Sequence, residues 1–468
     1  MLERRLTKKI GIYFVGMFAS KIFPFLLIPI YAFYVSSESL GYYDLIHTVM
    51  GIAKPFLYVA IWEAILRFVL SERNYEIQKN AITSSAIFVL LVSIFIFVCT
   101  FFLEVSYKTY DVPFILIGVM YISHSVAFVW QYYARALEFN KFYVYAGIIG
   151  TVVNFVFVIL LNVILKLELK GLIISYILGQ LSIFIFLEVK IKILRYISLS
   201  KFNVTILKEM LLFSSPLVLN LTSSWLISSY GRFLIINRLG AEANGLFSFA
   251  SRFSVVISMI GSVVTMAMIE EAIITAKTTG FNSKFRETIE NIFRIFLSIS
   301  IISVPLIVIF YSFIQNSEFY SSYKYAPWLL IFSVSSTLSS NIGSVFQAIS
   351  KTKYQFITTV IGAFVTVILS SLLINKVGIY AIIVGQVFGS ISMLLSRYFF
   401  VNKYVNLRIN WIPIINMSML FIIVTLLCLN LKITMILILL PIVLSLVGYF
   451  NRNFLYTTYN TLKQKIVR

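Results

Sequence analysis

The stretch AITSSAIFVLLVSIFIFVCTFFL, residues 81–103, is 23 residues long and contains no charged side chain. A helix needs about 20 apolar residues to cross the hydrocarbon core of a bilayer. The apolar residues follow one another without the period-two alternation of a barrel strand. The stretch therefore predicts a membrane-spanning helix, and the rest of the sequence repeats the same pattern.

The composition of the whole chain agrees with this interpretation. Of the 468 residues, 60% are hydrophobic and 12% are charged, whereas a soluble domain has about 25% charged residues. Short polar segments separate fourteen apolar runs, at about 10–34, 41–69, 81–103, 112–135, 142–165, 171–190, 210–236, 244–269, 291–314, 326–349, 356–375, 378–400, 411–430 and 433–450. We therefore expect an all-α polytopic membrane protein with about 14 transmembrane helices.

The basic residues indicate the orientation of these spans. The chain has 38 Lys and Arg and a formal net charge of +20. If the N-terminus lies inside, 25 of these residues fall in inside segments and seven in outside loops. Since cytoplasmic loops of membrane proteins are enriched in Lys and Arg, we expect both termini in the cytoplasm. The positive charge then reflects topology, and we expect no nucleic-acid partner.

The sequence contains no recognisable catalytic, metal-binding or nucleotide-binding motif. The two cysteines, Cys99 and Cys428, lie inside apolar runs and have no metal-binding or redox spacing. No GxxxxGK[ST] motif for ATP binding occurs. The loops between the predicted spans leave no room for a separate catalytic domain. We expect no catalytic residues, no metal and no cofactor, and we expect that the chain is not an enzyme.

Two halves of the chain resemble each other. ALEFNKFYVYAGIIGTVV, from Ala136, aligns without gaps to AISKTKYQFITTVIGAFV, from Ala348. KGLIISYILGQ, ending at Gln180, resembles VGIYAIIVGQ, ending at Gln386. These matches map spans 1–6 onto spans 7–12.

A repeat of six spans has an even number of crossings, so both halves have the same orientation in the membrane. This predicts two six-helix lobes related by a pseudo-two-fold axis along the membrane normal, with a cleft between them. We expect residues 1–200 to form the N-terminal lobe and residues 201–405 the C-terminal lobe. Residues 406–468 would then hold two further C-terminal helices, spans 13 and 14, and a cytoplasmic tail.

The region around spans 7 and 8 resembles a known family. FSSPLVLNLTSSWLISSYGRFLIINRLGAEANGLFSFASRF, residues 213–253, is similar to the corresponding part of Wzx-type polysaccharide flippases in the multidrug/oligosaccharidyl-lipid/polysaccharide (MOP) exporter superfamily. The matching positions are Pro216, Asn220, Trp225, Arg232, Leu239, Gly240 and Gly245. Gly231 and Phe247 stand where the family usually has Asp and Tyr, so no role of that acid is carried over to this chain.

The resemblance implies a flippase in the bacterial inner membrane. Such a protein moves an undecaprenyl-diphosphate-linked oligosaccharide, the repeat unit of an O-antigen (lipopolysaccharide) or a capsule, from the inner to the outer leaflet. It implies alternating access driven by an ion gradient (H⁺ or Na⁺), with membrane lipids and other polysaccharide-assembly proteins as partners. The alternatives are a multidrug or cation antiporter of the same superfamily, a lipid II flippase, and a membrane-integral polymerase or glycosyltransferase.

Basic residues inside the predicted spans are the candidates for substrate binding. A charge at the bilayer centre costs at least about 2.5–3.5 kcal/mol, so it needs a partner or a function. At 1.5 Å per residue, Lys21 lies about 16 Å from the inner face, and Lys54 about 20 Å and Arg252 about 12 Å from the outer face. With Arg232, they form a cationic set suited to a diphosphate. The alternative is that each base pairs with an acid or with a carbonyl freed by a proline.

A second set consists of groups that could carry a coupling ion or line the cavity. Asp44, His47 and Lys54 fall at helical angles of 0°, 300° and 280° if span 2 is straight at about 100° per residue. His47 and Lys54 therefore share a face, with Asp44 at its edge. His124 lies about 18 Å from the outer face in span 4. These residues could relay a proton, or they could be ordinary polar lining, and the sequence leaves both open.

Overall fold

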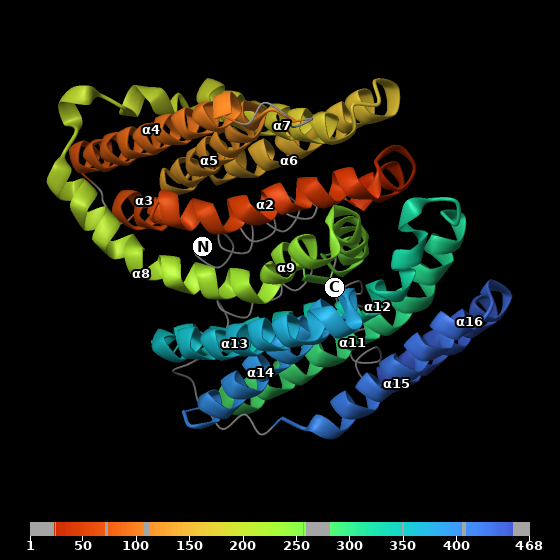
Figure 1. Ribbon diagram of the computed structural model, residues 1–468. Helices are drawn as coiled ribbons and strands as arrows, with labels where there is room; N and C mark the ends of the chain where they lie inside the picture. Colours follow the sequence, from red (N-terminus) through yellow and green to blue (C-terminus); the bar gives the residue numbers. More distant parts are fainter. Residues whose placement is uncertain are drawn as a thin grey trace, which may run out of the picture. The chain divides into compact units, whose positions relative to one another are not determined.

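The structure, a computed structural model, describes residues 23, 25–70, 74–106, 112–255, 257–258, 281–348, 351–404 and 409–452. Within these residues every regular element is a helix and none is a strand (Figure 1). The prediction of an all-α polytopic fold is thus confirmed.

Ten helices in the described part are long and apolar enough to cross a membrane. They coincide with the predicted spans 3–7, 9 and 11–14. Their bounds are α4 Tyr75–Ser106, α5 Phe114–Ala136, α6 Asn140–Val158 with its π-helical continuation η1 Ile159–Ile164, α7 Glu168–Ile191, α8 Val204–Ser228, α11 Phe281–Phe313, α13 Thr352–Val377, α14 Ile379–Asn402, α15 Trp411–Asn430 and α16 Ile433–Phe450.

The predicted span 2 is broken into two helices. α2, Ser37–Leu57, and α3, Ile61–Leu70, differ in direction by 54°. Pro55 lies in the last turn of α2, where its ring prevents the regular helical hydrogen bond. Val59 and Ala60 then adopt φ angles of 50° and 48°, and positive φ is a genuine outlier for a β-branched residue such as Val59. The bend is therefore a strained feature that the surrounding packing must hold in place.

The three remaining predicted spans also coincide with helices. α12, Ala326–Ala348, is a 23-residue helix rich in serine. The predicted spans at 10–34 and 244–269 contain the helix Phe25–Tyr34 and the helical segment 241–255, respectively. Both of these spans extend beyond the described residues.

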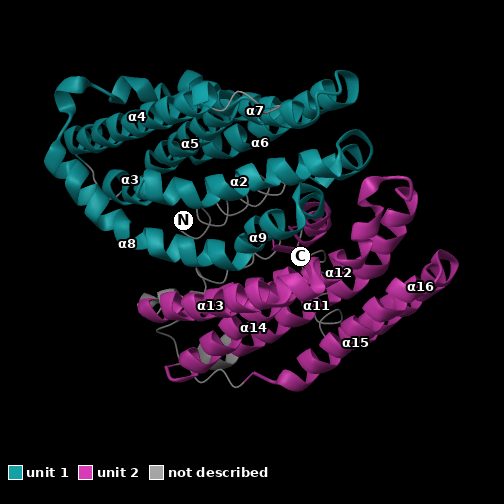
Figure 2. Cartoon of the chain, viewed as in Figure 1, with its two compact units in different colours: residues 1–245 teal, residues 246–468 magenta. Residues whose placement is uncertain are grey.

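The chain divides into two compact units, residues 1–245 and residues 246–468 (Figure 2). In unit 1, α7 packs against both α5 and α6. In unit 2, α14 packs against both α12 and α13, and α15 and α16 both pack against α11. The lobe boundaries near residues 200 and 405 come from the sequence repeat and stay a prediction.

The helix pairs that the repeat equates pack in a similar way. α6 approaches α7 where Gly150 and Gly179 face each other, so that a Cβ added at Gly179 would lie 2.8 Å from the Gly150 carbonyl oxygen. α13 approaches α14 near the equivalent Gly362, whose carbonyl oxygen would lie 2.7 Å from a Cβ added at Gly389. The matched glycines of the sequence repeat thus belong to the same type of helix contact in each unit.

Candidate functional site

Four polar side chains form a continuous row inside unit 1. The Lys54 Nζ atom lies 3.0 Å from His124 Nε2, and the Tyr176 hydroxyl lies 2.8 Å from His124 Nδ1. The ring of Tyr176 meets the ring of His47 edge to face, with centroids 4.6 Å apart. Three helices, α2, α5 and α7, therefore supply one connected group, which we call the lysine–histidine row.

The helical repeat explains why α2 contributes both ends of this row. His47 and Lys54 are seven residues apart, which brings two side chains to nearly the same face of a helix. α7 packs against both α2 and α5, and it carries Tyr176 between the two histidines.

Hydrogen-bond chemistry fixes the protonation pattern of the row when Lys54 is an ammonium. An ammonium can only donate, so His124 Nε2 must accept and carry no proton. His124 Nδ1 then holds the ring proton and donates it to the Tyr176 hydroxyl oxygen. In this state His124 is neutral, and the Lys54–His124 pair carries one positive charge, on Lys54.

Aromatic rings surround the Lys54 ammonium. It lies 3.6 Å from the ring centroid of Phe128 and 5.3 Å from that of Trp62, and both distances fall within the range of a cation–π contact. Trp62 belongs to α3, so the bend between α2 and α3 brings this ring to the lysine. Among the described residues, no salt bridge to Lys54 is found.

Asp44 and Arg232 form an ion pair between α2 and α9 (Tyr230–Leu239). Arg232 Nε lies 2.6 Å from Asp44 Oδ2, and Arg232 Nη1 donates to the Ser228 carbonyl oxygen at 2.7 Å. Asp44 precedes Lys54 by ten residues, a rise of about 15 Å along α2. Asp44 and Arg232 are therefore each other's ion-pair partners. The pair lies about 15 Å from Lys54 along the axis of α2.

The N-terminal half of α2 is closely packed against α8 and the start of the segment 241–255. Trp225 Nε1 donates to the Thr48 carbonyl oxygen at 2.9 Å, and Asn244 Nδ2 donates to the Gly41 carbonyl oxygen at 2.8 Å. Gly41 faces the backbone of Ala241, and a Cβ added at Gly41 would lie 1.9 Å from the Ala241 carbonyl oxygen.

Gly245 makes a similar contact one turn further along. A Cβ there would lie 1.8 Å from the Ser37 carbonyl oxygen. We call the contacts of Ser37, Gly41, Ala241, Asn244 and Gly245 the α2 seal. Only glycine permits two backbones to approach this closely.

The two remaining predicted site residues are Lys21 and Arg252. Lys21 lies outside the described residues. Arg252 lies on the helical segment 241–255, in unit 2, and is half-buried. Of the seven predicted residues, the structure therefore brings Lys54, His124 and His47 into one row and Asp44 and Arg232 into one ion pair.

Tyr176, Phe128 and Trp62 were not among the residues predicted from the sequence. All three are aromatic residues in apolar runs, where aromatic side chains are common. The hydroxyl of Tyr176 in the middle of a span was the available signal, since a buried tyrosine hydroxyl usually has a partner. In the described part of the chain, no group of three or more His, Cys, Asp or Glu side chains could hold a metal ion.

The fold has solved relatives. The inward closed conformation of the lipid II flippase MurJ superposes with a TM-score of 0.69 at 16% identity, covering 94% of this chain and 99% of that one. An inward-facing multidrug resistance MATE family transporter of the MOP superfamily gives a TM-score of 0.67 at 16% identity, over 82% of this chain and 94% of that one. An outward-facing structure of such a transporter gives 0.60 at 16% identity, over 85% and 96%. At these identities the likeness establishes the fold.

Sequence comparison gives the family. No match was found among curated protein sequences. The sequence profile of a family described as polysaccharide biosynthesis protein matches residues 6–269, which is more than half of the chain. The chain therefore belongs to this polysaccharide biosynthesis protein family and has the fold of MOP superfamily transporters, as its resemblance to Wzx-type flippases predicts.

Proposed function

We propose that this protein is a flippase that moves a diphosphate-linked lipid oligosaccharide from the inner to the outer leaflet of the bacterial inner membrane. The family supports a role in polysaccharide biosynthesis, and one protein of the same fold is a lipid II flippase. The proposal rests mainly on the position of Lys54. This lysine lies within a predicted span and contacts His124 and the rings of Phe128 and Trp62.

Lys54 has the properties of an anion site. A lysine deep in the membrane is costly, by about 2.5–3.5 kcal/mol at the helix centre. His124 accepts one of its three N–H donors, and the Phe128 ring faces the charge. The other donors can bind phosphate oxygens, as a lysine does when it acts as a point charge on phosphate. A diphosphate would thus supply the opposite charge for Lys54.

The same row provides a route for coupling transport to protons. With Lys54 charged, a second proton on His124 would remove the acceptor at Nε2 and put two positive charges 3.0 Å apart. A bound diphosphate would offset that repulsion and favour the doubly charged row. Substrate binding would then be accompanied by proton uptake at His124, and His47 is a second group on the same row that can take up a proton. H⁺ is therefore the coupling ion we favour, and Na⁺ is the alternative.

The α2 seal supports alternating access. By the predicted repeat, span 2 belongs to the N-terminal lobe and spans 7 and 8 to the C-terminal lobe. The α2 seal and the Asp44–Arg232 ion pair lie in the half of α2 that the charge pattern places outside. We infer that these contacts close the outer side and must separate to release the oligosaccharide. Arg252, in the predicted C-terminal lobe, and Lys21, in the predicted N-terminal lobe, are the two further bases that we propose for the diphosphate.

The chemistry of the row weighs against the alternatives. A cationic drug would require acids deep in the spans, whereas the row consists of bases and a tyrosine. A polymerase or glycosyltransferase would require catalytic groups on sizeable outer loops. The O-antigen or capsule repeat unit remains our favoured substrate over lipid II, because the family is one of polysaccharide biosynthesis. Both termini are expected in the cytoplasm.

Surface polysaccharide per molecule of membrane protein tests the proposal. Losing one buried charge-assisted contact costs roughly 1.5–3 kcal/mol, or about ten- to a hundred-fold in binding. Lys54→Ala should reduce surface polysaccharide by this order while the protein stays in the membrane, and Arg252→Ala should also reduce it. Lys54→Arg should retain part of the activity because it keeps the charge.

The control is Lys190→Ala, which removes an exposed lysine at the end of α7 and should have no effect. Normal polysaccharide per molecule in Lys54→Ala would show that the lysine is only structural, and the anion site would be rejected.

A further inference from the structure

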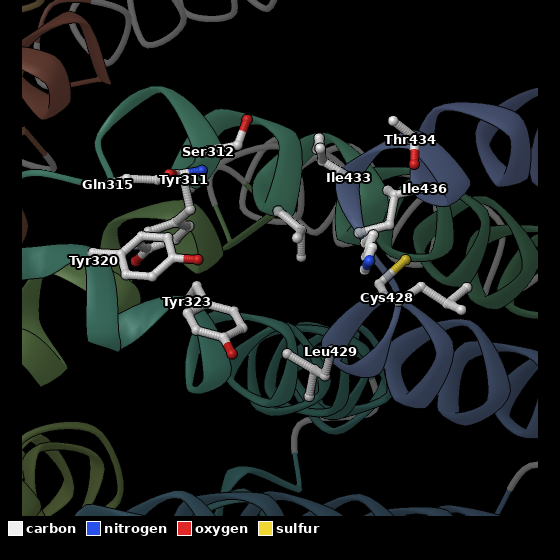
Figure 3. Close-up of a pocket in the computed structure, with 13 residues that line it drawn as sticks. Tyr311, Ser312, Gln315, Tyr320, Tyr323, Cys428, Leu429, Ile433, Thr434 and Ile436 are labelled. Atoms are coloured by element: carbon white, nitrogen blue, oxygen red, sulfur yellow. The ribbon is translucent and has the colours of Figure 1, made fainter.

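Unit 2 contains a cavity of about 390 Å³. Its lining residues do not belong to the lysine–histidine row of unit 1. It lies where the C-terminal end of α11 and the 3₁₀ segment η4, Glu318–Lys324, meet the turn between α15 and α16 (Figure 3). Its size falls within the range of about 300–1,000 Å³ that small-molecule sites occupy.

One wall of the cavity is aromatic. Tyr311, Tyr320 and Tyr323 line it (Figure 3). The rings of Tyr320 and Tyr323 lie 5.3 Å apart at an angle of 31°, and Tyr320 is 38% exposed. Aromatic surface thus remains open to a ligand at this wall.

Buried contacts fix the position of this wall. Tyr311 is fully buried, and its hydroxyl pairs with Ser322 Oγ at 2.7 Å. Phe319, also fully buried, stacks on Phe249 with centroids 4.5 Å apart. Since both Ser322 and Phe319 belong to η4, Tyr320 and Tyr323 are held on a rigid segment, which favours a preorganised site.

The rest of the lining combines hydrogen-bonding groups with an apolar surface. Gln315, Lys432 and Thr434 supply an amide, an ammonium and a hydroxyl. Leu429 and Ile433 form part of the opposite wall (Figure 3). No Asp or Glu is among the thirteen lining residues, so the site carries a single formal charge, on Lys432.

The predicted topology places the cavity on the outer face. Lys324 and Lys432 both belong to the few basic residues of the outside loops. The oligosaccharide of the proposed substrate reaches this face after translocation.

We propose that this cavity binds a saccharide. The C–H groups of a sugar ring carry partial positive charge and favour the negative face of an aromatic ring. The hydroxyl groups around the sugar ring match the amide, hydroxyl and ammonium of the rim. A lipid tail would not use this polar rim, and a diphosphate would require more than one base. The identity of the saccharide as the oligosaccharide of the translocated lipid rests on the function proposed above.

Protection of a cysteine from labelling tests this site in the full-length protein. Leu429→Cys, in a background of Cys99→Ser and Cys428→Ser, places a half-exposed thiol on the apolar wall. The protein in nanodiscs is labelled with a maleimide in the presence of one of two probes. The first is the oligosaccharide repeat unit cleaved from its lipid carrier, and the second is undecaprenyl diphosphate without sugar.

If the cavity binds a saccharide, the oligosaccharide should slow labelling of the Leu429→Cys thiol, and undecaprenyl diphosphate should not. Tyr320→Ala should weaken the protection about ten-fold in apparent affinity, because a stacked aromatic contact is lost. Tyr320→Phe should keep it. The control Tyr34→Ala, at an exposed tyrosine in unit 1, should leave it unchanged.

The result separates this site from the anion site of unit 1. In Lys54→Ala, protection by the free oligosaccharide should persist even though transport is strongly reduced. Protection by undecaprenyl diphosphate alone would mean a lipid headgroup site, and it would overturn the proposal. Labelling that neither probe slows would overturn it as well.

Discussion

The α2 seal makes a prediction that the geometry defines closely. In Gly41→Ala, the added methyl carbon would lie 1.9 Å from the Ala241 carbonyl oxygen and 3.0 Å from the Gly245 nitrogen. Both atoms belong to the backbone and cannot rotate away. Contacts between non-bonded heavy atoms are optimal at about 3.5–4.0 Å, so α2 and the segment 241–245 must move apart by more than an ångström. We expect Gly41→Ala to open the seal.

The size of the effect follows from two contributions. Overpacking in a well-packed interior costs typically about 1–3 kcal/mol. Loss of the hydrogen bond from Asn244 to the Gly41 carbonyl oxygen adds about 0.5–1.5 kcal/mol. Together they amount to about 1.5–4.5 kcal/mol against the closed state, a shift on the order of 10- to 2,000-fold in the equilibrium.

Accessibility from the outside measures this shift. Thr48 is 5% exposed and lies about two turns beyond Gly41 on α2. A Thr48→Cys reporter, with Cys99 and Cys428 replaced by serine, is labelled in intact cells by a membrane-impermeant maleimide. Gly41→Ala should raise the labelling rate by at least about ten-fold.

The matched control is Gly147→Ala on α6, where an added Cβ meets nothing within 4 Å. It should leave the labelling rate at the wild-type value. If Gly41→Ala accumulates normally in the membrane and still labels like the wild type, the α2 seal does not close the outer side, and our account of access is wrong.

Three further predictions concern topology, coupling and stability. Reporter fusions should show the cytoplasm at Lys201, Gly280 and Lys463, and the outside at Glu38, Glu168 and Ser321; two adjacent sites on the wrong side would refute the span count. His124→Gln keeps a hydrogen-bonding group but cannot gain a proton, so transport in vesicles should lose its dependence on a pH gradient, and an unchanged dependence would exclude His124 as the coupling group. Asp44→Asn, by contrast, should leave that dependence and weaken the ion pair with Arg232. Arg397 is buried and donates hydrogen bonds to Thr358, Thr359 and the Ser339 carbonyl oxygen. Arg397→Lys should lower the thermal unfolding temperature, because it loses hydrogen bonds worth about 1.5–3 kcal/mol each. The control Arg452→Lys, at an exposed arginine, should leave the unfolding temperature unchanged.

The helices themselves were predictable from the sequence because membrane spans are long and continuously apolar. Each of the ten long helices overlaps most of its predicted run, although α11 begins at Phe281, ten residues before its run, and α8 ends at Ser228, eight residues before the end of its run. The bend between α2 and α3 was only partly predictable. Pro55 indicates a disturbed helix, but the positive φ angles of Val59 and Ala60 depend on packing that no local pattern records.

The site was predictable where helical periodicity determines it. His47 and Lys54 share a face of α2, and both take part in the row. The partner of Arg232 was not predictable from spacing, because Asp44 lies 188 positions away along the chain and the contact depends on how α9 meets α2. Phe128 and Trp62 were missed for a similar reason, since only the fold brings these rings to the lysine.

Reconstituted transport is the decisive test of Lys54 as the anion site of a flippase. Purified protein is placed in proteoliposomes that hold a fluorescent lipid-linked oligosaccharide in both leaflets, and a reagent that cannot cross the membrane quenches the fluorophore from outside. We expect wild-type protein and Lys190→Ala to expose the inner-leaflet pool to the reagent, Lys54→Ala to do so at least about ten-fold more slowly, and Lys54→Arg to lie between them. Equal rates for the wild type and Lys54→Ala, in vesicles with equal amounts of protein, would exclude Lys54 as a substrate-binding residue.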